Sequence, residues 1–428
     1  MKIRQRKPAK WEDSPEVPGS LGEMLPYQED KFMKICTFEL MQRSVKISKR
    51  DFLRSGLLGL GTAILGLKAA GSFAKKLQFM ENESFNAPPG LGKYSRESPY
   101  YMVTPRGVKC QICPNNCILK EGQESICRTH VVSEDKLFTI AYGNPCSVHV
   151  DPIEKKPLFH FLPQSRSFSI ATAGCNLACL NCQNWEISQE SPRNTRNEEL
   201  FPASVVAKAV SDNCKSIAYT YSEPIAFYEY TFDTARLAKA RGLKNLFISN
   251  GYINEKPLRD LAKYLDAANI NLKSFSDEIY SKLNGGNLQP VLNTLKILKE
   301  EGVWLEITNL VVPGWTDQMD MIRKMCDWLY QNGFADSPLH FSRFFPLYKL
   351  TSLPYTPLPV LESARETAIQ SGLKYVYIGN VPGSSAENTY CPNCKKVVME
   401  RKGFTILNNN LIAGNCRYCG TKIAGVWY

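Results

Sequence analysis

Several things are scarce in this sequence of 428 residues, and each shortage excludes a class of protein. The apolar run at 55–67 has 13 residues, too few to span a bilayer as a helix, and the composition excludes a polytopic membrane protein. Residues 1–80 hold 15 basic and 8 acidic residues and so carry +7 of the net charge of +11. The rest of the chain is therefore nearly neutral. A near-neutral body does not favour nucleic-acid binding. Histidine, at four residues, is far rarer than cysteine, at fifteen.

The composition is otherwise that of a globular protein. Hydrophobic residues make up 43% and charged residues 22%, which excludes a mainly disordered chain. At roughly 150 residues per domain, the length predicts one large domain with one or two small ones.

Eleven of the cysteines fall into three tight groups. Disulfide frameworks belong to small secreted domains that lack a core, and a chain of this length does not need one. Short C-x-x-C spacings instead place sulfurs on one turn, where they suit a metal. The sequence therefore predicts a metalloprotein. The groups are Cys110/Cys113/Cys117/Cys127, Cys175/Cys179/Cys182 and Cys391/Cys394/Cys416/Cys419.

Residues 1–80 are predicted to be a leader rather than part of the fold. The first 50 are polar and lack periodicity, which is typical of disorder. The pair Lys49-Arg50 then precedes the apolar run 55–67 and a small-x-small site at 72–74. This order is similar to a twin-arginine export signal, with Lys49 in place of the first arginine. Export to the periplasm or cell envelope is expected, and a cytoplasmic protein with an unused or membrane-associating leader is the alternative.

From residue 167 onward, short apolar or β-branched runs alternate with helical patterns, which predicts an α/β fold with a parallel sheet. Polar residues and glycine cluster where the expected strands end, and both barrels and open sheets place their ligand sites there. Periodicity does not choose between the two. The expected strands are 167–174, 216–221, 245–250, 270–275, 304–312, 339–346 and 375–381, and the expected helices are 203–212, 226–241, 256–265, 288–301, 317–332 and 359–371.

The central group, Cys175-x3-Cys179-x2-Cys182, follows the first expected strand. Three thiolates in one loop can hold three irons of a 4Fe–4S cluster and leave the fourth iron without a protein ligand. An open iron can chelate the amino and carboxylate groups of S-adenosylmethionine (SAM), and a reduced cluster can then cleave its sulfonium bond to give a 5′-deoxyadenosyl radical. A structural zinc knuckle is the alternative.

The text CNLACLNC resembles the signature of the radical SAM superfamily. The wider text is similar to the radical SAM enzyme of the AmmeMemoRadiSam system, which is itself similar to pyruvate formate-lyase and other glycyl-radical-enzyme activating enzymes. The resemblance covers about residues 105–428, in chain order. It rests on residues 149–163, 172–189, 218–230, 247–253, 271–283, 310–317, 375–383 and 388–394.

The resemblance implies a partial or full (β/α) radical SAM barrel with the cluster loop after its first strand. It also implies which residues contact SAM, with an acidic residue for the amino group, strand-end residues for the ribose or carboxylate, and an apolar residue beside adenine. Two positions depart from the family: Asn181 replaces a common aromatic residue, and Asn271 replaces a common Asp. The implied SAM contacts are Glu223, Ser249, Asn250, Lys273, Asn181 and Val312. No catalytic residue is assigned beyond the cluster.

The two flanking cysteine groups are read as further metal sites. Cys391-x2-Cys394 and Cys416-x2-Cys419 are separated by 21 residues, the pattern of a zinc ribbon, with a second iron–sulfur cluster or a rubredoxin-like iron as alternatives. The spacing Cys110-x2-Cys113-x3-Cys117-x9-Cys127 is compatible with zinc or with an auxiliary iron–sulfur cluster that relays electrons.

The sequence thus predicts four parts: a leader at 1–80, a Cys-rich segment at 105–165, a radical SAM barrel at 166–385 and a zinc-ribbon-like module at 386–428. The expected function is radical SAM chemistry on an unidentified substrate, which the resemblance suggests is a protein. The resemblance also suggests Memo-like and AMMECR-like partners, and the chemistry needs a low-potential electron donor. A non-catalytic iron–sulfur or zinc protein, for electron transfer or binding, is the alternative. A zinc-ribbon nucleic-acid modifier is disfavoured by the neutral body.

Overall fold

The computed structural model of the protein describes residue 88 and residues 90–427. The predicted leader and its export-like motif lie outside the described residues. Among the helices that are described, none is long and apolar enough to cross a membrane.

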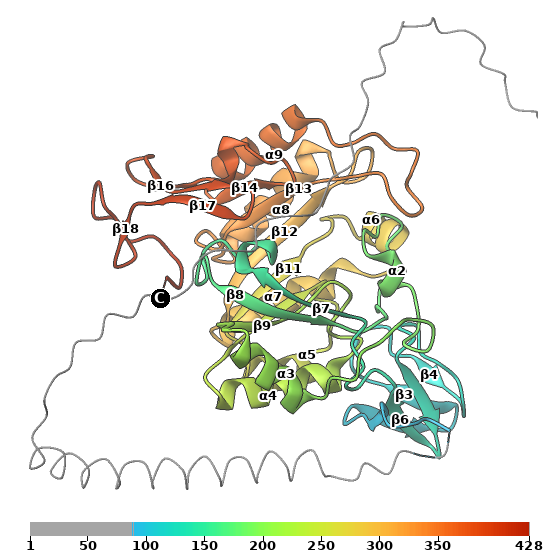
Figure 1. Ribbon diagram of the computed structural model, residues 1–428. Helices are drawn as coiled ribbons and strands as arrows, with labels where there is room; N and C mark the ends of the chain where they lie inside the picture. The colour runs from blue at the N-terminus through green and yellow to red at the C-terminus, as the bar shows by residue number, and fades with distance from the viewer. Residues whose placement is uncertain (1–87, 89, 428) are drawn as a thin grey trace, which may run out of the picture. The chain divides into compact units, whose positions relative to one another are not determined.

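An eight-stranded sheet carries the fold, in the order β14-β13-β12-β11-β10-β9-β8-β7 (Figure 1). Strands β8 to β14 run parallel, and β7 pairs antiparallel with β8. All seven expected strands are confirmed, although β11 starts three residues earlier than expected. The strands are β7 (Ser147–Pro152), β8 (Arg166–Ala171), β9 (Ser216–Tyr219), β10 (Lys244–Ser249), β11 (Ala267–Asn271), β12 (Trp304–Val311), β13 (Leu339–Arg343) and β14 (Val376–Gly379).

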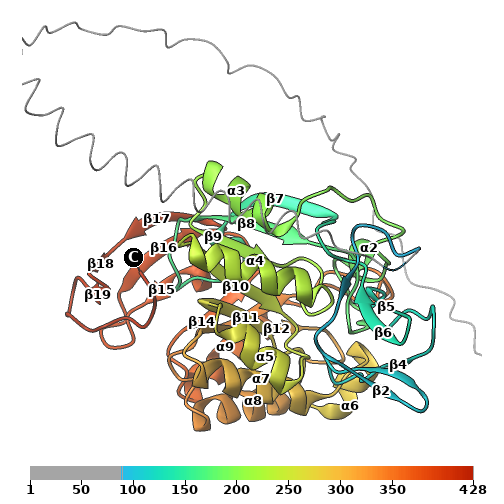
Figure 2. The ribbon, with the colours of Figure 1, turned by 90° about the horizontal axis from the view of Figure 1, so that it is seen from below.

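Helices that follow the parallel strands cover the outer face of the sheet (Figure 2). The six expected helices are confirmed. Pro202 opens the first of them, where its fixed φ suits the first turn. The last ends at Gln370 and is followed by Gly372 at φ +98°, the expected stop. They are α3 (Pro202–Ser211), α4 (Tyr228–Ala240), α5 (Glu255–Ala262), α7 (Leu288–Glu300), α8 (Met319–Gln331) and α9 (Leu358–Gln370).

The sheet is barrel-like but does not close, because β7 and β14 are its two edges and do not pair with each other. The fold is therefore α/β with a partial barrel, which settles the choice that the periodicity left open. Strands such as β9, buried at every position, read as continuous apolar runs because helices cover one face and the barrel interior the other.

The segment after β7 crosses the barrel interior and forms the floor of the cavity described below. It begins with the 3-10 helix η1 (Ile153–Lys155), and its backbone is held by side chains from two strands. Asn269 Nδ2 donates to the Pro157 carbonyl at 2.8 Å, and the Glu306 carboxylate accepts from the His160 amide at 2.8 Å. Because Asn269 and Glu306 are fully buried, the segment is part of the core rather than a surface loop.

Two small antiparallel sheets precede the barrel, and the sequence did not predict their strands. They pack against the helices and loops of the barrel: Tyr100 OH donates to Asp260 Oδ2 at 2.9 Å, and the Asn254 amide donates to the Ile112 carbonyl at 3.0 Å. The strands are β1 (Arg96–Glu97), β5 (His130–Ser133) and β6 (Lys136–Thr139) in one sheet, and β2 (Tyr101–Thr104), β3 (Gly107–Cys110) and β4 (Ile118–Leu119) in the other.

Short strands also form the C-terminal part of the chain. The buried Arg401 joins it to the barrel floor, because its Nη2 donates to the Phe159 carbonyl at 2.8 Å. The strands are β15 (Thr389–Tyr390), β16 (Val397–Lys402) and β17 (Thr405–Asn409) in one sheet, and β18 (Leu411–Ile412) and β19 (Asn415–Cys416) in another.

Candidate functional site

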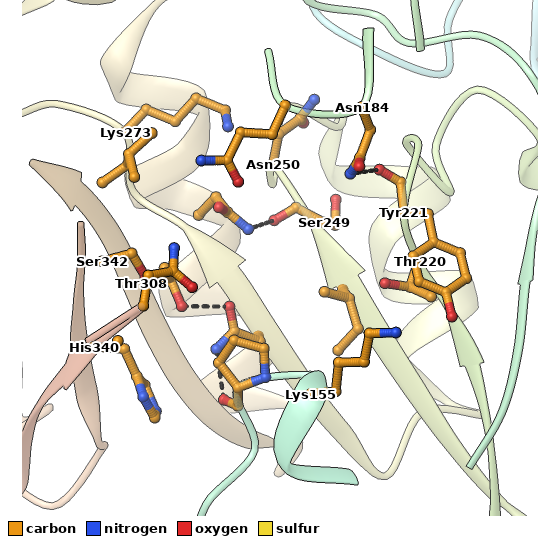
Figure 3. Close-up of a pocket in the computed structure, with 18 of the residues that line it drawn as sticks. Lys155, Asn184, Thr220, Tyr221, Ser249, Asn250, Lys273, Thr308, His340 and Ser342 are labelled. Atoms are coloured by element: carbon orange, nitrogen blue, oxygen red, sulfur yellow. Dashed lines mark hydrogen bonds between the residues drawn. The ribbon is translucent and has the colours of Figure 1, made fainter. Parts of the chain in front are cut away.

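The structure gathers eight of the nine residues predicted for the cluster and SAM around one cavity of about 590 Å³. It lies where the parallel strands end, and Figure 3 shows Ser249, Asn250 and Lys273 facing the same space. Parallel strands present their carboxyl ends at one edge, so residues distant in sequence converge there. The predicted residues that line the cavity are Cys175, Cys179, Asn181, Cys182, Glu223, Ser249, Asn250 and Lys273.

The cysteine loop after β8 is anchored by a second loop. The amides of Ala178 and Leu180 donate to the carbonyls of Asn284 and Leu283, both at 2.9 Å. Asn284 Nδ2 also lies 3.3 Å from Cys179 Sγ and can donate to it. The anchoring residues end a π-helical turn, η2 (Tyr280–Asn284), a rare conformation that is frequent at functional sites. All three thiols are free, so the donor set and the backbone that holds it suit an iron–sulfur cluster.

Two asparagines connect the cysteine loop to the end of β10. Asn250 Nδ2 donates to Asn176 Oδ1 at 2.8 Å, and Asn176 Nδ2 donates to the Tyr252 carbonyl at 2.7 Å. The Tyr252 amide returns a hydrogen bond to Asn250 Oδ1 at 2.8 Å. This closed network fixes the backbone next to Cys175. Asn176 was not predicted from the sequence.

Glu223 is buried and receives hydrogen bonds from β10. Ser249 Oγ donates to its Oε1 at 2.7 Å and the Asn250 amide donates to its Oε2 at 2.8 Å. Burial raises the pKa of Glu223 to about 7, although these hydrogen bonds oppose the shift. A cationic group bound in the cavity would favour the carboxylate form.

Lys273 and Asn181 offer complementary groups. Burial acts to lower the pKa of Lys273, but the nearby loop thiols and Glu223 outweigh it and the net shift is upward, so the side chain stays cationic. Asn181 is buried, and its Oδ1 has no hydrogen-bond partner among the residues that the structure describes. A buried acceptor is expected to have a partner, so a donor on a bound molecule would satisfy it.

A different arrangement holds the four C-terminal cysteines. Their sulfur atoms all lie within 4.8 Å of one another, with Cys391 Sγ 3.6 Å from Cys419 Sγ and Cys394 Sγ 3.7 Å from Cys416 Sγ. Four thiols this close can bind a single metal ion. The four N-terminal cysteines line a separate, small cavity behind the cysteine loop.

Comparison with known proteins decides the family. The radical SAM superfamily matches residues 169–328, which include the cysteine loop and strands β9 to β12. The chain belongs to the radical SAM superfamily. This membership implies a 4Fe–4S cluster and SAM as cofactors, and the chain's three loop thiols and cavity suit them.

Relatives of this radical SAM protein include an uncharacterized protein of Methanocaldococcus jannaschii, 45% identical over 331 residues, which is 77% of this chain and 98% of that protein. The pyruvate formate-lyase 1-activating enzyme of Escherichia coli strain K12 is 26% identical over 164 residues, 37% of this chain and 67% of that enzyme. A solved domain of a pyruvate-formate lyase-activating enzyme from Bacteroides vulgatus aligns with a TM-score of 0.33 at 14% identity, over 39% of this chain and 99% of that domain.

The radical SAM cavity differs from expectation at Val312. This residue is buried against Leu283 and Phe344 and does not line the cavity. Thr308 and Leu310, on alternate positions of β12, line it instead. The resemblance implied Val312 as the apolar residue beside adenine, but β12 ends at Val311 and the backbone then turns, with the Val312 amide donating to Thr316 Oγ1 at 2.8 Å.

The far part of the radical SAM cavity is polar, and of its residues the sequence singled out only Asn271, as a departure from the family. Thr308 Oγ1 donates to Asn269 Oδ1 at 2.9 Å, and Asn271 Nδ2 reaches the Ser249 carbonyl at 3.5 Å (Figure 3). His340 lines the cavity while its Nε2 contacts Glu306 Oε2 at 2.7 Å. No single-residue motif marks such positions, because they meet only when the strands assemble.

Replacing Gly174 with Ala is expected to destabilise this radical SAM protein. Gly174 has φ +104°, and an added Cβ would lie 2.5 Å from the Cys127 carbonyl oxygen and from Thr129 Cγ2. The expected cost is about 3 kcal/mol, from the unfavourable backbone conformation and the clash together. Gly302→Ala is the matched control, since Gly302 has φ +74° and open space around it, and should cost only about 1 kcal/mol. Thermal unfolding of both variants measures the difference, and equal shifts would contradict the close packing.

Proposed function

We propose that the chain is a radical SAM enzyme that acts like the activating enzymes. One observation carries the proposal: three free thiols, a buried carboxylate, a cationic amine and an unpaired amide oxygen line a single cavity. These are the groups needed to hold a cluster with one open iron and a ligand with cationic, anionic and hydrogen-bonding parts. The residues in question are Cys175, Cys179, Cys182, Glu223, Lys273 and Asn181.

Each side chain has a part in binding and orientation. The three thiols would hold a 4Fe–4S cluster, which would supply one electron, received from a donor, for the reductive cleavage of SAM and so for radical abstraction of hydrogen from the substrate. Glu223 receives the SAM amino group. Ser249 and Asn250 hold the carboxylate oxygens of Glu223 in place. Lys273 offsets negative charge at the cysteine loop. The floor formed by the segment after β7 limits the access of water from that side.

Asn181 is assigned to the adenine. Where many superfamily members place an aromatic residue, this chain has an amide whose buried Oδ1 is unpaired and can accept from the exocyclic amine.

Asn181→Ala is therefore expected to weaken SAM binding about tenfold, the value of one hydrogen bond to a buried acceptor. Isothermal calorimetry on the reconstituted protein measures the Kd. Asn293→Ala removes an exposed amide on α7, outside the cavity, and should leave the Kd unchanged. An unchanged Kd in Asn181→Ala would show that this amide does not contact SAM.

The substrate class is proposed from the relatives. Their names state that they activate pyruvate formate-lyase, which is itself a protein. We extend this to a protein substrate for this chain, with a low-potential one-electron donor. Memo-like and AMMECR-like proteins are the proposed partners. Polar groups in the far part of the cavity, among them Thr308 and His340, are placed to contact the substrate.

The C-terminal thiols are proposed to hold zinc as a zinc-ribbon-like module. Zinc bound by four thiolates at about 2.3 Å brings the sulfurs to roughly 3.8 Å from one another. The Sγ–Sγ distances of 3.6 and 3.7 Å in the structure are close to that value. The module's role is structural, because β16 and the buried Arg401 tie it to the barrel floor.

The function is tested by anaerobic reconstitution of the full chain with iron and sulfide, reduction with dithionite and addition of SAM. Formation of 5′-deoxyadenosine, measured by mass spectrometry, is the expected result. Protein that carries about four irons on the cysteine loop but forms none, even with candidate protein substrates added, would support the non-catalytic electron-transfer or binding alternative. Absence of iron from that loop would overturn the proposal.

A further inference from the structure

The four N-terminal cysteines surround a cavity of their own. It lies between the two small sheets and the loops of the barrel, and its wall contains no disulfide. Three of the four thiols are buried and Cys117 is half-buried. The residues that line it are Cys110, Ile112, Cys113, Asn115, Cys117, Ser125, Cys127, His130, Asn176 and Ile225.

Local backbone structure brings the four thiols to this cavity. Cys110 is the last residue of β3, and its amide donates to the Cys117 carbonyl at 2.9 Å across the pairing with β4. A tight turn between them places Cys113, whose carbonyl accepts from the Asn116 amide at 3.1 Å. Cys127 lies in the next turn, closed by the Arg128 amide on the Ser125 carbonyl at 2.9 Å. Two turns and a strand pair thus direct the sulfurs inward.

The spacing of these thiols differs from that of the C-terminal group. Within the described part of the chain, only the C-terminal group brings three or more His, Cys, Asp or Glu ligand atoms within 4.8 Å of one another. A single zinc ion needs that closeness. In a four-iron cluster each thiolate binds a different iron, so the sulfurs stand farther apart around a common centre. The N-terminal thiols line one cavity without that closeness, which disfavours a single ion and is compatible with a four-iron cluster.

Buried polar groups support one of these thiols. Ser125 Oγ and Thr129 Oγ1 lie 3.0 Å from Cys127 Sγ, and His130 Nδ1 lies at 3.5 Å. His130 Nε2 in turn contacts the Glu229 carboxylate at 3.2 Å. Both His130 and Glu229 are almost fully buried. A carboxylate and an imidazole placed one behind the other next to a thiol are the kind of outer support that orients metal ligands.

We propose that Cys110, Cys113, Cys117 and Cys127 bind a second 4Fe–4S cluster. Four protein thiolates leave no open iron, so this cluster is suited to electron transfer rather than to SAM binding.

The second site adjoins the first. Asn176, directly after Cys175, lines the N-terminal cavity, and its carbonyl accepts from Asn115 Nδ2 at 2.7 Å. Gly174, directly before Cys175, packs so closely on the Cys127 carbonyl that a Cβ would not fit. A single stretch of backbone therefore separates the two sites. On the proposed function, the second cluster takes one electron from a low-potential donor and passes one electron to the cluster on the central loop.

The metal site is tested by counting iron, acid-labile sulfide and zinc in the anaerobically reconstituted full chain. We expect about eight irons in the wild type and about four in a Cys175/Cys179/Cys182→Ala variant, with zinc unchanged. A Cys113/Cys117→Ser variant should also lose about four irons. The control is Cys214/Cys326→Ser, which removes two isolated buried thiols and should keep all eight.

The central triple variant decides the outcome, because it leaves the N-terminal thiols untouched. If it retains no iron, or if it holds a second zinc instead, the proposal is overturned whether or not SAM cleavage is observed. Should Cys113/Cys117→Ser also lose the C-terminal zinc, it has failed to fold and the triple variant alone is used.

The electron-transfer role has a separate readout. Low-temperature EPR of the dithionite-reduced wild type should show signals broadened by coupling between two neighbouring paramagnetic centres. The Cys175/Cys179/Cys182→Ala variant and the Cys113/Cys117→Ser variant each keep one cluster, so each should give one narrow signal. Two signals that simply add, without coupling, would overturn the adjacency while leaving the second cluster in place.

Discussion

A chain in which Cys175, Cys179 and Cys182 are all replaced by Ala is expected to form no measurable 5′-deoxyadenosine, a loss of at least about a thousandfold. On the proposed function the three thiols are the cluster's protein ligands, and without them a cluster that delivers an electron to SAM would have no attachment. The loop itself should persist, because its backbone hydrogen bonds to Leu283 and Asn284 do not involve the sulfurs. Mass spectrometry of the quenched reaction measures the product.

The matched control removes the same number of thiols elsewhere. Cys146, Cys214 and Cys326 are free and lie outside all three cysteine groups, so their replacement by Ala should leave product formation within about twofold of wild type. Zinc bound to the C-terminal thiols serves as the check that the triple variant is folded. Product formation by a folded, iron-free loop variant would place the chemistry elsewhere in the chain.

The second large effect is expected at Glu306. Its fully buried carboxylate accepts hydrogen bonds from the Phe159 amide at 3.0 Å and the His160 amide at 2.8 Å, and it contacts His340 Nε2 at 2.7 Å. Glu306→Gln keeps the shape of the side chain but replaces one carboxylate oxygen with an NH2 group, which cannot accept a hydrogen bond from the backbone amides or from His340. Losing one partner of a buried charged network costs about 3 kcal/mol or more. We therefore expect the Tm to fall by roughly 5 °C or more.

The pH dependence of that loss can be stated with its sign. Burial alone would raise the pKa of Glu306, but the hydrogen bond and charge of His340 outweigh it, so the pKa lies below its ordinary value. A lowered pKa stabilises the fold above the unfolded pKa of about 4.3 and loses that stabilisation as the pH falls. The Tm difference between wild type and variant should shrink in acid. Glu278→Gln, on an exposed carboxylate, is the control and should change the Tm little at any pH.

The parallel strands and their helices could be predicted because each is a local pattern. Strands buried on both faces, such as β9, appear as unbroken apolar runs, and helix ends carry their own signals, such as Gly372. The polar strand β7 and the two- to four-residue strands of the N-terminal sheets were not predicted from the sequence, for the opposite reason. They are too short or too polar to carry a period, and only pairing with their neighbours defines them.

The residues of the candidate site likewise fall into those that the sequence predicted and those that it did not. Cysteine spacing and the family resemblance located the cysteine loop, Glu223 and Asn250, which now line one cavity, while their roles toward a cluster and SAM stay predictions. Asn176 and Asn284 were not predicted as site residues because an asparagine has no sequence signal of its own. Each acquires a role only through contacts across the fold. Val312, which the family resemblance implied, lies outside the cavity because the backbone turns directly after β12.

Three residues of the cavity wall, Glu387, Gly403 and Phe404, come from the stretch of chain that also carries the four C-terminal thiols. If these thiols hold the proposed zinc, the shape of the cavity depends on that metal as well as on the barrel. Cys419 is the exposed member of that thiol group and the one that an oxidant reaches first. On the proposed function, loss of a metal from these thiols would move this part of the wall and change which molecules the cavity admits.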